Sequence, residues 1–424
     1  MKRKTSLILY VGLGLVGLLI AAAASMQDGI LWRWPLALRR GAEAKWSGPR
    51  PESITLPFQL LTGHILLQTR VDGSRPLSFL LDTGDRFAVI DTDRAKELGI
   101  ETAAQFEVKG VGSEKAVGAL VKSSTVEVVG LPGFSQALTV TIPLRSMASK
   151  FGHDLDGLLG ANFLRQFVVE IDYPARTMTL FDPDRFHYSG PGESIPLHLD
   201  DERHPVIEAE VTAVGAPPVR GSFALDLGAG DGLVLFSPFV AQQHLPGSAM
   251  KTMKALGGGI GGTSAGRVGH VESIKIGRFT MRSPNTLFSE DHAGAYASAL
   301  LLGAIDRQIV ARCRVFLDYP HGRLMLEPVG GLEQTWDVAM TGIRLDAEGA
   351  DYSAVRVSQV LEDSPGSDAG LQPHDLIRRI DDQPASALTL SDMLEMFEQP
   401  RTRRLEVQRG AQTLTLELTP KVTF

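Results

Sequence analysis

The chain of 424 residues contains a single cysteine, Cys313, and no strong excess of charge of either sign. One cysteine cannot form an intrachain disulfide or a metal site by itself, which argues against a disulfide-stapled secreted scaffold. Because Cys313 lies in the apolar, strand-like run 309–316, we interpret it as a small buried hydrophobe. The formal net charge of -7 comes from interspersed acidic and basic residues, so nothing indicates nucleic-acid binding.

Motifs for metals, cofactors and nucleophilic serines are weak. His153, next to Asp154 and near Asp156, comes nearest to a metal cluster but lacks ligand spacing. The glycine run 257–262 has the spacing of a dinucleotide loop, without a convincing preceding strand or a following helix. The segment 262–266 fits a nucleophile elbow, yet an alternating, strand-like segment follows it where a helix is required. We therefore expect no metal and no cofactor.

The N-terminus has the composition of an export signal. Lys2, Arg3 and Lys4 precede an uncharged apolar run from Leu7 to Ala24, which is close to the length of a spanning helix. The basic flank predicts that the N-terminus stays in the cytoplasm and that the remaining chain is exported. We expect a signal anchor or signal peptide at 1–26, with the apolar run as a transmembrane helix, and a juxtamembrane linker at 27–50. The protein would then be a single-pass protein of the bacterial inner membrane with its folded domains in the periplasm. Secretion after signal cleavage is the alternative.

The middle of the chain is an internal repeat. The segments 78–84 and 222–228 each place an aspartate after an apolar strand, at Asp82 and Asp226. Each copy continues to an apolar-apolar-Gly element and to an Asp-Tyr-Pro; these are 158–160 and 172–174 in one copy, and 301–303 and 318–320 in the other. Because the separations of the three markers agree within a few residues, we place one lobe at about 51–190 and a second at about 191–330.

Short strands bounded by Gly, Pro and Asp predict that both lobes are mainly β. Strand-like segments precede each aspartate, at His64–Val71 and Pro205–Val211. Brief helices are expected at Thr92–Leu98, near Phe163, and at Pro238–His244.

Two lobes that each present a buried-strand carboxylate suggest a dyad. Thr83 and Gly84 predict a tight turn after Asp82, and glycine permits close approach of another backbone. If the lobes pack face to face, Asp82 and Asp226 share a proton, because like charges that are so close cannot both ionise easily. One carboxylate then acts as general base on a water while the other, protonated, polarises the scissile carbonyl.

These motifs resemble the signature of pepsin-like and retroviral-type aspartic proteases. The resemblance covers roughly residues 55–328 and implies that Asp82 and Asp226 are catalytic. It implies that Thr83, Gly84, Leu227 and Gly228 support them, together with Gly160 and Gly303 on the strands that thread the catalytic loops. Leu227 departs from the family, which normally has Thr or Ser there, so one half of a cross-lobe hydroxyl brace is missing.

The resemblance also implies a flexible hairpin over the cleft. The candidate in the first lobe is the run 110–118, with Gly110, Gly112 and Gly118, and the glycine-rich run 257–266 is its counterpart. The first hairpin has no tyrosine, a feature of retroviral-type rather than pepsin-like enzymes.

Residues 337–424 form a separate pattern. Strand-like 354–360 precedes the run 364–371, and a helical apolar spacing follows at 388–397. This series resembles bacterial PDZ domains. The resemblance implies that a peptide adds as a strand beside the segment that holds Gly342, Ile343, Arg344 and Leu345. A docking module that binds no free peptide is the alternative.

The sequence thus predicts a membrane-tethered aspartic endopeptidase with protein or peptide substrates and no nucleic-acid partner. A PDZ-like domain would bind peptide C-termini or a partner protein. Two alternatives stay open. One is an inactive, protease-like peptide-binding scaffold, in which Leu227 marks a decayed site. The other is a dimer in which each chain contributes only Asp82.

Overall fold

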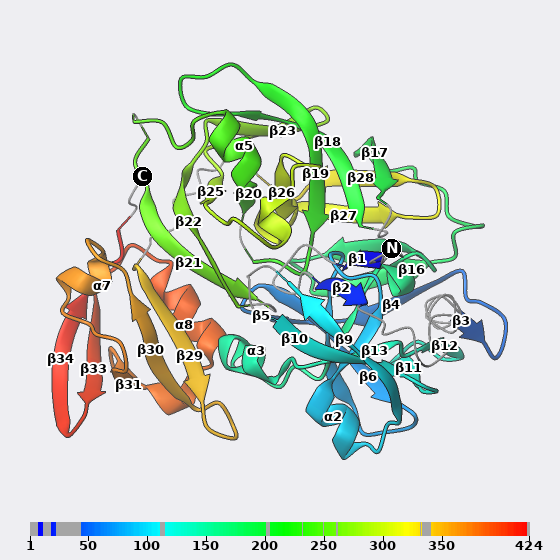
Figure 1. Cartoon of the computed structure of the whole chain (residues 1–424), viewed down its shortest axis with the longest axis horizontal. Helices are drawn as coiled ribbons and strands as arrows, with labels where there is room; N and C mark the ends of the chain where they lie inside the picture. Colours follow the sequence, from blue (N-terminus) through cyan, green and yellow to red (C-terminus); the bar gives the residue numbers. More distant parts are fainter. Residues whose placement is uncertain are drawn as a thin grey trace, which may run out of the picture. The chain divides into compact units, whose positions relative to one another are not determined.

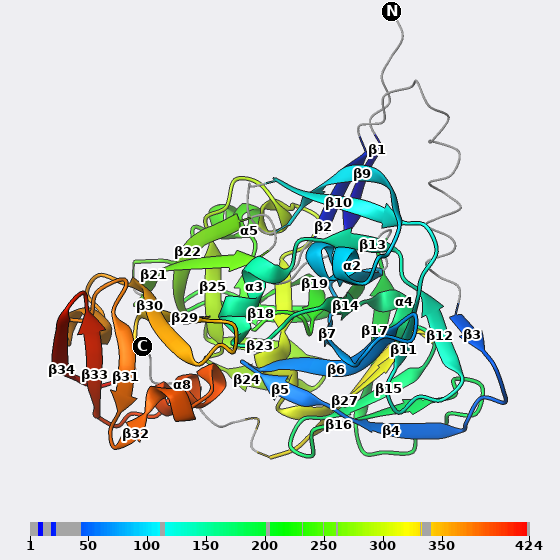
Figure 2. The same cartoon turned by 90° about the horizontal axis from the view of Figure 1, so that it is seen from below.

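The computed structural model describes residues 7–11, 18–22, 44–110, 115–200, 204–230, 232–248, 250–259, 262–330, 332 and 341–421 (Figures 1 and 2). The chain divides into two compact units. The larger unit contains residues 1–60, 64–144 and 156–334, and the smaller contains residues 61–63, 145–155 and 335–424. Strands dominate both units, as the sequence predicted.

The first lobe of the larger unit is built on a hairpin that ends at Asp82. Its elements are β6 (His64–Val71), β7 (Leu77–Leu81), β8 (Ala88–Asp91), α2 (Thr92–Glu97), β9 (Thr102–Lys109), β10 (Lys115–Val121), β11 (Thr125–Val128), β12 (Phe134–Ala137), β13 (Val140–Ile142), β14 (Gly157–Leu159) and α4 (Ala161–Leu164). Strand β14 lies between β7, to which it is parallel, and β8, to which it is antiparallel. All five residues of β7 are buried, which fixes the position of the aspartate that follows.

The second lobe repeats this order of elements. It consists of β18 (Pro205–Thr212), β19 (Val219–Asp226), β20 (Leu233–Leu235), α5 (Ser237–Gln242), β21 (Met253–Gly259), β22 (Gly262–His270), β23 (Ser273–Ile276), β24 (Phe279–Arg282), β25 (Asn285–Ser289), η2 (Ala295–Ala297), β26 (Gly303–Asp306) and α6 (Arg307–Val310). Strand β26 runs parallel to β19 and antiparallel to β20, as β14 does between β7 and β8.

A continuous sheet joins the two lobes. Its order is β17-β28-β27-β15-β16-β4, in which β15 of the first lobe pairs antiparallel with β27 of the second. These strands are β4 (Ser53–Pro57), β15 (Val168–Asp172), β16 (Thr177–Phe181), β17 (Glu193–Leu199), β27 (Cys313–Asp318) and β28 (Arg323–Pro328). Cys313 is buried on β27, as expected for a small hydrophobe. Short strands β3 (Ala44–Trp46) and β5 (Gln59–Leu61) extend the first lobe's sheet.

The N-terminal segment differs from the expected helix. Leu7–Val11 and Leu18–Ala22 are strands β1 and β2, which pair with each other, and β2 also pairs with β9. The residue types account for this. Ile, Tyr and Val favour extended structure. The remaining residues of the expected helix, 12–17 and 23–24, lie outside the described ranges. Within the described ranges, no helix is long and apolar enough to cross a membrane.

The C-terminal part of the smaller unit is a sheet with one long helix. The sheet order is β29-β30-β31-β33-β34, with β32 beside β31. Its elements are β29 (Ile343–Glu348), β30 (Ala354–Val360), α7 (Pro365–Asp368), β31 (Leu376–Ile380), β32 (Gln383–Pro384), η3 (Ala385–Ala387), α8 (Leu390–Phe397), β33 (Arg403–Arg409) and β34 (Gln412–Leu418). A capping box between Thr389 and Asp392 begins α8, whose buried face joins the core of this unit. Helix α3 (Arg145–Phe151) also belongs to the smaller unit.

The brief helices expected in the two lobes are confirmed as α2, α4 and α5. The helical apolar spacing near the C-terminus is confirmed as α8, and the strand expected over 354–360 is β30.

Candidate active site

The two repeated aspartates occupy equivalent, buried positions. Asp82 follows β7 and is 0% exposed, and Asp226 ends β19 and is 1% exposed. The backbone N–H of Gly84 donates to Asp82 Oδ1 at 2.8 Å, and that of Gly228 donates to Asp226 Oδ1 at 2.9 Å. Each Asp-X-Gly turn thus folds back on its own carboxylate and fixes its orientation.

The two aspartate loops meet at Gly228. A Cβ atom on this glycine would lie only 2.5 Å from Asp82 Cγ, and even closer to Asp82 Oδ1. Only a residue without a side chain allows the Asp82 carboxylate to pack directly on the loop that carries Asp226. The carboxylates predicted to form a dyad therefore belong to loops in direct contact.

A single hydroxyl connects the loops by hydrogen bonds in both directions. Thr83 Oγ1 donates to the carbonyl oxygen of Leu225 at 2.8 Å and accepts from the N–H of Leu227 at 2.8 Å. Leu227 is 0% exposed and has no hydroxyl to return the bond. The cross-lobe brace expected from the resemblance is present from the first lobe and missing from the second, as the sequence predicted.

Burial and crowding of negative charge favour the protonated form of Asp82. Burial raises the pKa of Asp82 well above its ordinary value, and the charges of Asp226 and Asp85 raise it further. Among the described residues, none donates a hydrogen bond to Asp82 Oδ2, so that oxygen is suited to hold a proton. Asp82 can therefore keep its proton above the pH at which an ordinary aspartate has lost it.

Gly160 secures the Asp82 loop from behind. Its N–H donates to the carbonyl oxygen of Phe87 at 3.0 Å, and the next N–H, of Ala161, donates to that of Asp85 at 2.7 Å. A Cβ at Gly160 would lie 2.7 Å from the Phe87 oxygen, so this close approach requires glycine. The supporting role expected for Gly160 has a direct geometric basis.

Gly303 does not occupy the position that the sequence pattern gave it. It pairs with Phe223 on β19, and its counterpart in the first lobe is Gly157, which pairs with β7 at the equivalent residue. The counterpart of Gly160 is Asp306, whose N–H donates to the carbonyl oxygen of Gly232 at 2.9 Å. The sequence-based prediction was wrong because the apolar-apolar-Gly triplet at 301–303 lies three residues before 304–306, the segment that is structurally equivalent to 158–160.

The expected hairpins are present in both lobes. Strands β9 and β10 pair antiparallel around the segment 111–114, and β21 pairs with β22. Gly110 follows β9, whereas Gly112 lies outside the described residues. Gly118 is inside β10, where a Cβ would lie 2.7 Å from the Phe106 ring and 2.8 Å from a backbone oxygen, so its role is close packing.

Two buried histidines were not recognised from the sequence. His64 begins β6, in the register that brings it beside Asp82, and a Cβ on Gly230 of the other lobe would lie 3.2 Å from its Cε1. His204 precedes β18, in the register that brings it beside Asp226, and its Nδ1 lies 2.9 Å from Asp200 Oδ2. Their equivalent positions in the two copies of the repeat could have identified them from the sequence, although neither belongs to the Asp-X-Gly motif.

Two further groups near the aspartates were missed. Burial raises the pKa of Asp85 to about 7, although the N–H of Phe87 and the charge of His204 act in the opposite direction. Burial also raises the pKa of Tyr319, and the charges of Asp82 and Asp226 add to this. Tyr319 belongs to the second Asp-Tyr-Pro marker, which the sequence showed only as a repeat.

In the smaller unit, the residues predicted to bind peptide surround the start of β29. Gly342 has a positive φ of 67° and accepts a hydrogen bond from the N–H of Leu361 at 2.8 Å. Ile343, Arg344 and Leu345 are the first residues of β29, which lies at the edge of its sheet.

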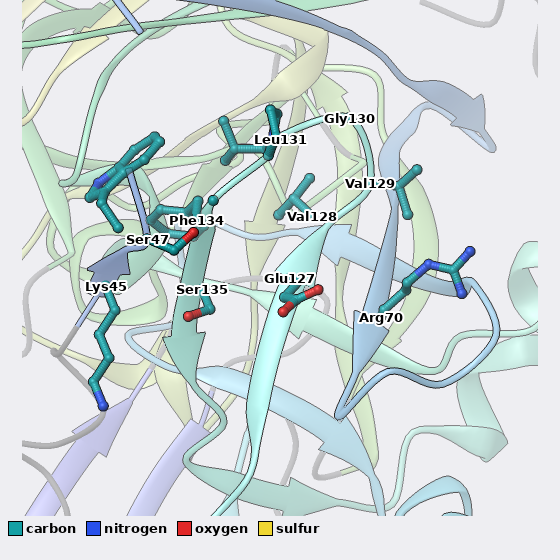
Figure 3. A pocket seen from close by; sticks show the side chains of 13 residues that line it. Lys45, Ser47, Arg70, Glu127, Val128, Val129, Gly130, Leu131, Phe134 and Ser135 are labelled. Carbon is teal, nitrogen blue, oxygen red and sulfur yellow. The ribbon is translucent and has the colours of Figure 1, made fainter. Parts of the chain in front are cut away.

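A separate pocket of about 620 Å³ lies on the first lobe (Figure 3). Its lining includes the paired residues Arg70 and Glu127 and the turn 129–133 between β11 and β12. None of the predicted catalytic or supporting residues lines it, so it is distinct from the aspartate site.

A comparison with known families matches part of the larger unit. Residues 67–163 match the model of the aspartyl protease family, a range that contains the Asp82 loop and Gly160. No curated protein matches the chain. The first lobe is therefore similar to aspartyl proteases, which supports a general aspartic protease function.

Replacing Thr83 by Val should destabilise the larger unit, because Leu225 O and Leu227 N would both lose a buried partner. Each unsatisfied backbone group is expected to cost about 1–3 kcal/mol. Thr83→Ser keeps the hydroxyl and should lose only about 1 kcal/mol, for the missing methyl group. Urea unfolding of the two variants measures this difference, and equal losses would contradict the brace.

The free energy of unfolding should rise as the pH falls from about 7 towards 4. Protonated Asp85 stabilises the fold fully below its unfolded value of 3.8, and this contribution is lost as the pH rises through its folded pKa of about 7. The raised pKa of Asp82 acts in the same direction. Asp85→Asn should flatten this pH dependence in urea titrations. An unchanged slope would show that Asp85 is not the responsible group.

Proposed function

We propose that the chain is an aspartic endopeptidase whose dyad is Asp82 and Asp226. The packing of the Asp82 carboxylate against Gly228, two residues beyond Asp226, carries this proposal. The reciprocal bonds of Thr83 across the lobes and the raised pKa of Asp82 support it.

The two carboxylates would divide the chemistry through one shared proton. The ionised carboxylate accepts a proton from a water that attacks the carbonyl carbon of the scissile peptide bond. The protonated carboxyl donates to the carbonyl oxygen, which gives a neutral tetrahedral gem-diol. Transfer of a proton to the amide nitrogen then breaks the C–N bond and releases an amine and a carboxylic acid. No covalent enzyme intermediate forms.

A second candidate function is a peptide-binding scaffold without catalysis, which Leu227 favours. The missing hydroxyl leaves only one side of the brace, and an error of about 1 Å in the position of a catalytic group can cost about a hundredfold in rate. Thr83 compensates in part, because its oxygen contacts backbone groups on both sides of Asp226. The enzyme is therefore the better supported of the two functions.

The C-terminal domain is proposed to bind an extended peptide in the manner of a PDZ domain. Strand β29 lies at the edge of its sheet, and helix α8 is adjacent to it. An edge strand next to a helix is suited to peptides that add one strand to the sheet. Such binding would select or position protein substrates for the aspartate site.

Asp82→Asn and Asp226→Asn should each reduce cleavage of an unfolded protein by several orders of magnitude without unfolding the chain. Asn cannot replace the ionised or the proton-donating carboxyl. Asp382→Asn changes a carboxylate that is 94% exposed in the C-terminal domain and serves as the matched control. Cleavage in the presence of H₂¹⁸O should place one ¹⁸O in each new carboxyl group.

Binding of peptides without cleavage by the unmodified chain would establish the scaffold instead. Specific activity that rises steeply with protein concentration would point to a dimer that uses only Asp82. Activity proportional to concentration, and loss of activity in both Asn variants, supports the intramolecular dyad.

We further propose that the chain is exported and held at the inner membrane by residues 1–26. The basic residues before the apolar run motivate this. The protein should remain with membranes after alkaline carbonate extraction and be digested by protease added to spheroplasts. A variant that starts after residue 26 should be found in the cytoplasm. Release of the full chain by carbonate would contradict the tether.

A further inference from the structure

The outer edge of β29 is a surface on which a peptide strand can be added. Among the described strands of its sheet, only β30 pairs with β29, so the opposite edge presents backbone groups that no strand uses. Helix α8 lies beside this strand, and Ala347 and Leu390 belong to the core that the two elements share.

A segment of the chain itself lies at this place. Helix α3 packs against β29, and Gly152 follows the helix with a positive φ of 62°. A Cβ on Gly152 would lie 2.8 Å from the Cβ of Leu390, at the start of α8, and 3.6 Å from the Cβ of Ala347, on β29. Gly152 is therefore wedged between the strand and the helix.

Polar contacts hold the same segment. Tyr352 donates from its hydroxyl to Asp154 Oδ1 at 2.9 Å. Burial lowers the pKa of Lys150 on α3, and the charges of Arg344 and Asp346, both on β29, act on it in opposite directions. The stretch from α3 to Asp154 thus contacts β29, α8 and Tyr352 through apolar packing, the close approach of Gly152 and one hydrogen bond.

We infer that residues 145–155 are the internal occupant of the β29 edge, and that an extended partner peptide must displace them to add a strand there. The inference rests on the proposed peptide-binding function of the C-terminal domain. It deepens that function, because it makes peptide binding a competition between a partner and the chain's own segment.

The segment continues directly into the support of the catalytic loop. Asp156 accepts from the N–H of Ser78 at 2.8 Å and from Arg94 Nε at 2.6 Å, and β14 then runs beside β7 towards Asp82. A peptide that displaces 145–155 therefore releases the chain immediately before β14.

Gly152→Asn in the full chain tests the occupant. Asn tolerates a positive φ, so the substitution acts mainly through the bulk that it places against Leu390. Gly99→Asn is the matched control, because Gly99 follows α2 with a φ of 68° and a Cβ there would have nothing within 4 Å. Hydrogen exchange measured by mass spectrometry reports the protection of residues 343–348.

We expect exchange over 343–348 to be faster by about tenfold in Gly152→Asn, and unchanged in Gly99→Asn. Equal protection of residues 343–348 in both variants would contradict the inference that residues 145–155 occupy the β29 edge. Faster exchange over 343–348 without a change over 156–159 would support residues 145–155 as the occupant of the β29 edge. It would contradict the inference that their displacement affects β14. Neither readout requires cleavage, so a failure of the peptidase proposal is recognised separately.

If Gly152→Asn does not fold, Tyr352→Phe replaces it. This variant keeps the ring, which packs against the domain core, and removes the hydroxyl that donates to Asp154. We expect a smaller rise in exchange over 343–348, of about two- to threefold. No rise in this variant would contradict the inference.

Discussion

The site depends on one hydroxyl group. Thr83 lies between the two lobes and bonds to backbone groups on either side of Asp226. Because Leu227 cannot reciprocate, the alignment of the two loops depends on this oxygen and on the close contact of Gly228 with the Asp82 carboxylate. The shared sheet through β15 and β27 holds the lobes together, but the fine position of the two acids is set at the brace.

The repeat made much of this arrangement predictable. An apolar strand that ends in aspartate, followed by a tight glycine turn, is a local pattern, and β7 and β19 follow it. The brief helices were equally local, since their residue spacing and flanking residues are visible in the sequence. The prediction that the two aspartates form a pair followed from the duplication rather than from any single motif.

The features that could not be predicted from the sequence depend on strand register and on tertiary contacts. In the sequence pattern, Gly303 appears equivalent to Gly160. In the structure, the strand pairing places Gly303 three residues before the equivalent position, which Asp306 occupies. His64, His204 and Tyr319 approach the aspartates only after folding. The N-terminal run satisfied a length criterion for a helix, and its described parts, Leu7–Val11 and Leu18–Ala22, are strands.

Because the two lobes belong to one chain, equivalent positions in them can hold different residues. Where the first lobe has Thr83 and Asp85, the second has Leu227 and Ala229, a difference that a symmetric pair of identical chains cannot adopt. Under the proposed function, a polypeptide bound at this site would contact different residues on its two sides. Such a polypeptide would then bind in one backbone orientation, and the side-chain specificity before the cleaved bond would differ from that after it.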